Sequence, residues 1–316
     1  MPSRTPEPSP SPSPVSASST EFQDAAETSS EIARATSENA VREAGRLEGA
    51  LANLAKARSD ENLALSREAL STARAAYFQM ESAVLFDGDE FGREAASLPE
   101  PVALPGNGED NRFSQIESLL KSYEHPASEG LVVSRFSLER NQTVADLKIA
   151  AENLRLAMEK FSASWGKDDP ANFRNAVFLS DPEAAIGQVL QGLMKTSDWI
   201  AAQAGALPAG EIAPRLRAIQ SYCLGMYDDG AGRVTGRGLT ALVASRSPGE
   251  AEDLASHLAG SLRDLEEGPP DPNRVRSQFL EISGRMQRAA EALGFRVESS
   301  VDDSVVTDST SGRTPN

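Results

Sequence analysis

The chain has 316 residues, of which 39% are hydrophobic and 5% aromatic, enough for one large or two ordinary domains around an aliphatic core. Its 47 acidic and 31 basic residues give a formal net charge of −16 at pH 7, and a field of that sign disfavours nucleic acids and anionic lipid surfaces as partners. No run approaches the roughly 18 apolar residues of a membrane helix, and the one cysteine, Cys223, excludes an intramolecular disulfide or a cysteine-cluster metal site.

The two ends of the chain are polar. Residues 1–20 consist mostly of alternating Pro and Ser, a composition that predicts a disordered linker. This segment lacks the basic start and the apolar run of about 7–15 residues that mark a secretory signal. We therefore expect the chain to be cytosolic as written, or a mature form whose export signal has been removed. Residues 297–316 are similarly polar and are predicted to be a disordered tail.

Between the ends, apolar residues recur at alternating steps of three and four, which places them on one face of a helix. The clearest of these stripes run through residues 63–84, 144–165, 212–226 and 275–293, and weaker ones through 40–54, 116–123 and 254–265. No segment alternates with period two over a useful length. So many long helices exceed one four-helix bundle, and the sequence predicts an all-α fold of two packed bundles, residues 21–168 and 169–296.

Helix starts are indicated where a capping side chain precedes proline, which is tolerated at the first helical position. This occurs at Asp169, Asp181, Ser247 and Asp271. Ser247 and Glu250 also have the spacing of a capping box.

Two segments, 86–110 and 230–238, are irregular. Residues 228–238 are rich in glycine, but Thr235 stands where a dinucleotide-binding loop needs its third glycine, and a helix rather than a strand precedes them. We therefore predict a flexible loop between helices in this region.

Two motifs carry a family resemblance. In residues 73–81, Arg74 is followed three residues later by the aromatic Tyr77 and four residues after that by Glu81. Residues 112–120 read Arg-Phe-Ser-Gln-Ile-Glu-Ser-Leu-Leu, which is similar to the signature Gly-Phe-His-x-Ile-Glu-x-Leu-Leu. Both motifs resemble those of the imelysin family, and weaker similarity extends the resemblance over residues 60–295.

The resemblance implies a two-bundle, all-helical bacterial protein that is exported to the periplasm or the cell surface, where the Pro/Ser segment would serve as a spacer. The family includes a metallopeptidase group and relatives tied to iron uptake. The resemblance thus implies iron or another divalent metal as the bound ion, and other cell-envelope or metal-uptake proteins as partners. No Cys-x-x-Cys-His motif is present, so no covalent haem is expected.

The chain departs from the family at the metal-binding pair His-x-x-Glu, because Ser114 takes the place of the histidine while Glu117 remains. A serine hydroxyl is a far weaker ligand for a transition metal than imidazole. A related module, fused ahead of di-haem peroxidase domains, also lacks the histidine and has Gln at the position of Gln115.

The resemblance places a degenerate metal site at Glu81, Ser114 and Glu117, supported by Arg74, Tyr77 and Gln115. The alternative is a buried Arg–Glu network that fixes the register of the helices, since charges that point inward must be paired.

A second candidate metal site lies on one predicted helix, where Asp253, His257 and Asp264 share a face. A solvated polar face explains the same pattern. We expect His125 to interact with the end of a helix, and Cys223 to be a buried, inert thiol.

The resemblance and these residues leave three hypotheses about function open. The first is a non-catalytic protein that binds metal or assists in its uptake. The second is a metallopeptidase that uses Glu117 with substitute ligands such as Asp253 or His257. The third is a metal-free scaffold that binds another protein through one face of a bundle.

Overall fold

The computed structural model describes residues 19–57, 59–86, 112–124, 133–267 and 271–296. Most predictions for the ends of the chain, for the irregular segment 86–110 and for His125 lie outside these residues. Nearly all of the described chain is helical, which confirms the all-α prediction. None of its helices is both long and apolar enough to cross a membrane.

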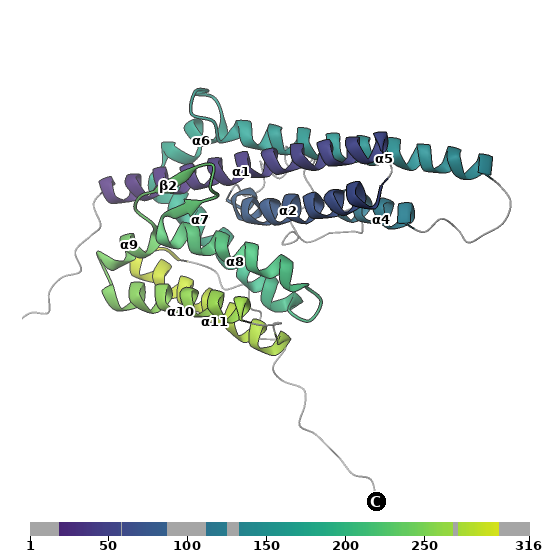
Figure 1. Cartoon of the computed structure of the whole chain (residues 1–316). Helices are drawn as coiled ribbons and strands as arrows, with labels where there is room; N and C mark the ends of the chain where they lie inside the picture. The colour runs from purple at the N-terminus through teal and green to yellow at the C-terminus, as the bar shows by residue number, and fades with distance from the viewer. Residues whose placement is uncertain (1–18, 58, 87–111, 125–132, 268–270, 297–316) are drawn as a thin grey trace, which may run out of the picture.

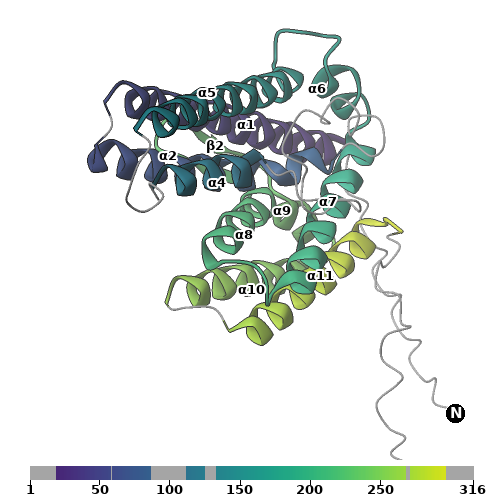
Figure 2. The same ribbon diagram turned by 90° about the vertical axis from the view of Figure 1, so that its right-hand side faces the viewer.

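The long helices form two groups (Figures 1 and 2). The first group contains α1 (Ser19–Lys56), α2 (Asp60–Val84), α4 (Arg112–Glu124) and α5 (Val133–Ser164). The second group contains α7 (Pro182–Gln203), α8 (Ala209–Leu224), α10 (Pro248–Glu266) and α11 (Pro272–Leu293), together with the short α9 (Leu239–Ala244). The short helix α6 (Phe173–Ala176) and the 3₁₀ turn η2 (Phe178–Ser180) connect them.

The groups share a continuous core, because α2 packs on α8 and α1 packs on α7. The predicted stripes supply this core. Every apolar residue that recurs along the stripe of α11 is buried, as is the stripe of α1 from Ala40 to Leu54. Burying one such Leu, Ile or Phe side chain contributes roughly 1.5–3 kcal/mol. Hydrophobic periodicity is therefore the main reason that these segments are helices packed in these orientations.

The end of α8 differs from the prediction. The stripe was expected to continue to Met226, but the helix ends at Leu224 because Gly225 adopts a left-handed backbone with φ 68°. Met226 then lies at the start of a strand and is 52% exposed.

The flexible loop predicted for residues 228–238 is wrong, because most of this segment is an ordered β-hairpin. Strand β1 (Met226–Asp228) pairs antiparallel with β2 (Arg233–Thr235), with Tyr227 opposite Val234. The hairpin is attached to α1 by an ion pair of 2.6 Å between Arg42 and Asp229. Strands of three residues are too short to produce a visible period-two pattern.

The helix starts are partly as predicted. The side chains of Asp181 and Asp271 accept hydrogen bonds from the backbone N–H groups of Ala184 and Asn273, and so cap α7 and α11. The capping box at Ser247 is wrong, because this side chain makes no capping bond and Glu250 instead pairs with Arg288.

Ser247 does precede the start of α10, as predicted, whereas Asp169 is not a helix start. Its carboxylate accepts from the N–H of Ala171 in a turn, and α6 begins only after Asn172.

We expect Gly238→Ala to destabilise the protein by about 1–3 kcal/mol, the usual range for overpacking. A Cβ atom at this position would overlap the backbone of Gly225 and Cys223, where the hairpin leaves and returns to the helices. Gly232→Ala in the same hairpin is the matched control, since its Cβ atom would lie 3.9 Å from Oδ1 of Asp229, an ordinary contact distance, and it should stay within about 0.5 kcal/mol of the parent. Urea unfolding followed by circular dichroism measures both, and equal midpoints for the two variants would contradict the packing argument.

Candidate functional site

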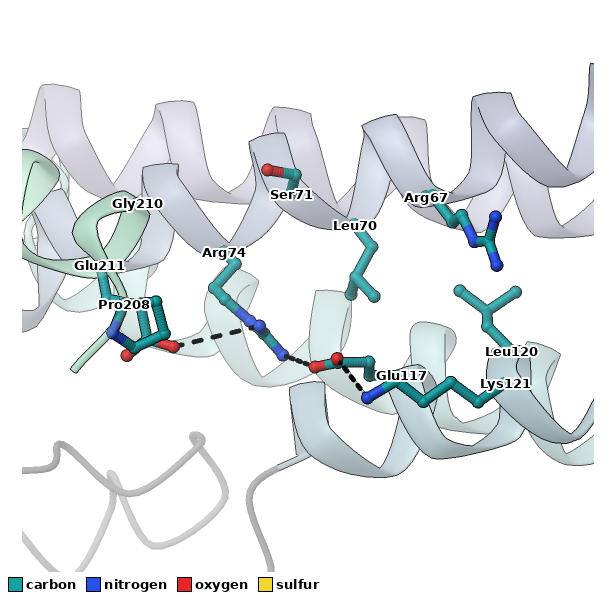
Figure 3. Close-up of a pocket in the computed structure, with 10 residues that line it drawn as sticks. All are labelled: Arg67, Leu70, Ser71, Arg74, Glu117, Leu120, Lys121, Pro208, Gly210 and Glu211. Carbon is teal, nitrogen blue, oxygen red and sulfur yellow. Dashed lines mark hydrogen bonds and ion pairs between the residues drawn. The ribbon is translucent and has the colours of Figure 1, made fainter. Parts of the chain in front are cut away.

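Two of the predicted site residues, Arg74 and Glu117, line a pocket of about 360 Å³ where α2, α4 and the start of α8 meet (Figure 3). Helix α2 places Arg74 there because the residue lies beside the buried stripe that contains Leu70 and Ala73. The pocket is lined by Arg67, Leu70, Ser71, Arg74, Glu117, Leu120, Lys121, Pro208, Gly210 and Glu211.

Both carboxylate oxygens of Glu117 are bound to cations. Oε2 lies 2.9 Å from Nη2 of Arg74, and Oε1 lies 2.8 Å from Nζ of Lys121, one helical turn further along α4 (Figure 3). The hydrogen bonds from Lys121 and then Arg74 lower the pKa of Glu117 below its usual value, against the opposing effect of burial. Glu117 is therefore ionised at neutral pH, and a metal ion would have to compete with two bound cations.

Glu81 is paired deeper in the protein. Its Oε2 lies 2.6 Å from Nε of Arg215 on α8, and the two side chains are 3% and 0% exposed. The guanidinium of Arg215 lies over the ring of Phe78, 3.6 Å from its centroid, and also donates to the backbone carbonyl of Glu211 at 2.9 Å. The ion pair thus joins α2 to α8 at the contact between the two helix groups.

Arg215 was missed in the sequence, although a signal for it exists. Ile212, Arg215 and Ile219 follow steps of three and four, so the arginine lies on the predicted buried stripe of α8. A basic residue at such a position requires an acidic partner from another helix.

These residues form a series of alternating charges across three helices. It runs through Glu81, Arg215, Glu211, Arg74, Glu117 and Lys121, and the longest step in it is 4.0 Å between Arg74 and Glu211. Three acids and three bases balance each other. These contacts are those of the Arg–Glu network that the sequence left open as the alternative to a metal site.

The remaining predicted residues of this site lie around the network. Ser114 and Gln115 are exposed on α4, and Tyr77 is buried with its ring 5.5 Å from that of Phe113. Within the described part of the chain, no group of three or more His, Cys, Asp or Glu side chains is arranged to hold a metal ion. Metal binding by Glu81, Ser114 and Glu117 stays a prediction of the resemblance.

The second candidate site consists of contacts between α10 and α11. Asp253 lies 2.9 Å from Arg285 and 3.2 Å from Arg288, while Nδ1 of His257 lies 3.6 Å from Glu281.

Asp264, further along α10, binds the side chains of Gln278 and Arg274. His257 also lies near the backbone carbonyl of Gln278, at 3.4 Å. The three predicted ligands thus make their contacts with residues of α11.

Cys223 is fully buried, and burial raises the pKa of its thiol to about 12. It is therefore protonated at neutral pH, in agreement with the predicted inert thiol.

The fold and this pocket define an all-α protein of two packed helix groups that are joined by an ionic network. The sequence matches no family model and no curated protein. Among solved structures, the fold is similar to that of a Parabacteroides distasonis protein provisionally named an iron-regulated protein A precursor, with a TM-score of 0.60 and 12% sequence identity over 89% of this chain and 95% of the other. At this identity the likeness establishes a shared fold.

We expect Glu81→Ala to destabilise the protein by about 3–5 kcal/mol, because it removes the closest and most buried countercharge of Arg215 and leaves only the longer contact to Glu211. The double variant Glu81→Leu with Arg215→Met should recover most of this loss, since it removes both charges and keeps apolar volume. Glu250→Ala is the matched control, because its pair with Arg288 is partly exposed and should contribute only about 0–1 kcal/mol. Urea unfolding measures all three, and similar midpoints for Glu81→Ala and Glu250→Ala would refute the role of the buried pair.

Proposed function

We propose that this protein is a non-catalytic, imelysin-like accessory protein of iron acquisition, which works in the periplasm or at the cell surface. Its fold is similar to that of a protein named as an iron-regulated precursor, and residues 73–81 and 112–120 resemble the imelysin motifs. Its partners would be other proteins of the cell envelope or of metal uptake.

The non-catalytic assignment rests on one observation: both motif glutamates are held in ion pairs with basic side chains. Glu117 binds Arg74 and Lys121, and Glu81 binds Arg215. A carboxylate held by two cations is a poor general base, because its lowered pKa weakens its affinity for a proton at neutral pH. The same cations neutralise the charge that would attract a metal ion.

The metallopeptidase alternative has less support. It needs Glu117 on α4 to act with Asp253 or His257 on α10, but these residues make their contacts with different helices. The metal-free scaffold differs from our proposal only in having no link to iron.

Metal titration tests whether this accessory protein itself binds a metal ion. We expect the purified protein to bind none of Fe²⁺, Fe³⁺, Zn²⁺ and Ca²⁺ stoichiometrically, because Arg and Lys occupy the acids of the network. Elemental analysis and calorimetry check this, with Glu117→Ala and the control Glu250→Ala. Stoichiometric binding that is lost in Glu117→Ala alone would instead establish the degenerate metal site, and chelator-sensitive proteolysis would establish the peptidase.

The link to iron is tested in the source organism. We expect iron limitation to raise the level of the protein, and deletion of its gene to lower the uptake of radioactive iron, with zinc uptake as the control. Complementation with the wild-type gene should restore uptake. If iron limitation does not change the level of the protein and deletion of the gene does not change iron uptake, the link to iron is wrong. The scaffold alternative would then remain.

A further inference from the structure

The pocket gathers positive charge in a strongly acidic protein. Three of its lining residues, Arg67, Arg74 and Lys121, are basic, and two, Glu117 and Glu211, are acidic, so its lining is formally positive in a chain with a net charge of −16. Anions are repelled by most of such a protein, and a local positive site concentrates them.

The basic groups come from two helices, α2 and α4, that line the same pocket. Figure 3 shows the guanidinium of Arg67 extending from α2 toward Leu120 on α4, with Arg74 further along α2 and Lys121 reaching back along α4. Arg67 is exposed and the side chain of Lys121 is 68% exposed, so a ligand reaches both without unfolding the helices.

Arg74 is the most buried of the three cations, with 22% of its side chain exposed. It makes one close pair, to Glu117, while Glu211 stays 4.0 Å away. A ligand carboxylate that binds this side of the guanidinium would replace the longer contact to Glu211 and leave the bond to Glu117 in place.

The remaining surfaces of the pocket suit the carbon skeleton of a small acid. Leu70, Leu120 and Pro208 supply apolar contacts. The volume of about 360 Å³ lies in the range of small-molecule sites, which combine mostly apolar walls with a few polar groups that orient the ligand.

From this arrangement we propose that the pocket binds a small polycarboxylate, with carboxylate groups distributed over Arg67, Arg74 and Lys121. Several cations held apart on two helices select a ligand with several separated carboxylates over one with a single group. The iron connection rests on the proposed function: a polycarboxylate offers the oxygen ligands that hard cations prefer, so Fe³⁺ would arrive bound to the ligand and would need no protein ligand.

Calorimetry with citrate tests the pocket directly. We expect one citrate to bind per chain, with an affinity that falls as salt is added. The double variant Arg67→Gln with Lys121→Gln should weaken binding about tenfold or more, as the loss of two charge-assisted contacts predicts. Arg217→Gln is the matched control, because Arg217 is an exposed arginine on α8 that pairs with Glu266 outside the pocket, and it should bind citrate like the parent.

Propane-1,2,3-tricarboxylate and acetate extend the test. The tricarboxylate should compete with citrate, and acetate at the same concentration should not. The absence of citrate binding at low salt, equal weakening in the control variant, or equal competition by acetate would each overturn the proposal. Thermal unfolding of every variant, which should match the parent, excludes loss of fold as the cause of a negative result.

Calorimetry with ferric citrate distinguishes a failure of the pocket proposal from a failure of the proposed function. Binding of both free and ferric citrate, lost in the double variant, supports a carrier of the chelate. Binding of free citrate alone supports the polycarboxylate site and removes its link to iron. If neither binds while deletion of the gene still lowers iron uptake, the pocket proposal is overturned and the accessory function stands.

Discussion

Arg215 and Glu81 are charged side chains with almost no exposure, and the arrangement of the two helix groups depends on their contact. Removing a guanidinium or a carboxylate from water is so costly that each must meet its partner with good geometry. In the observed register of α8 against α2, Nε of Arg215 lies 2.6 Å from Oε2 of Glu81 and the guanidinium stacks on Phe78. A shift of either helix that separated the pair would leave two buried charges uncompensated at this contact.

The position of the pocket follows from that register. Glu211 lies one turn before Arg215 on α8, so the contact that anchors the helix also brings Glu211 and Pro208 to the edge of α2. Arg74 then lies between Glu211 and Glu117. The buried pair and the exposed pocket are therefore two ends of one ionic network, and a change at the buried end is expected to alter the geometry at the open end.

Most of the helices and about half of the residues of the site could be predicted from the sequence. Periodicity identified α11 and the second half of α1, from Ala40 to Leu54, because the buried residues of these segments recur at steps of three and four. Arg74 and Glu117 were found through motif resemblance, yet their pairing with each other depends on how α2 meets α4, which no local pattern encodes. Arg215 stood on a predicted stripe and was overlooked because that stripe was read as apolar.

The remaining errors have a common physical cause. The hairpin at residues 226–235 and the true partner of Glu250 are both decided by contacts between segments far apart in the chain. Asp229 is an example, because it reaches Arg42 across 187 positions. Local propensity at the hairpin, with its glycines and short strands, favours a loop, and tertiary contacts override it.

A bound metal ion and a set of basic side chains solve the same electrostatic problem, since each supplies positive charge to carboxylates that helix packing brings together. In the imelysin signature a histidine and a glutamate share one helix face, whereas this chain has Ser114 in place of the histidine and two bases on Glu117. Because Arg74 and Lys121 both bind Glu117, a metal ion would have to displace at least one of them to reach its carboxylate. On the proposal above, the pocket, whose lining has three basic and two acidic residues, favours a carboxylate ligand that brings its own metal.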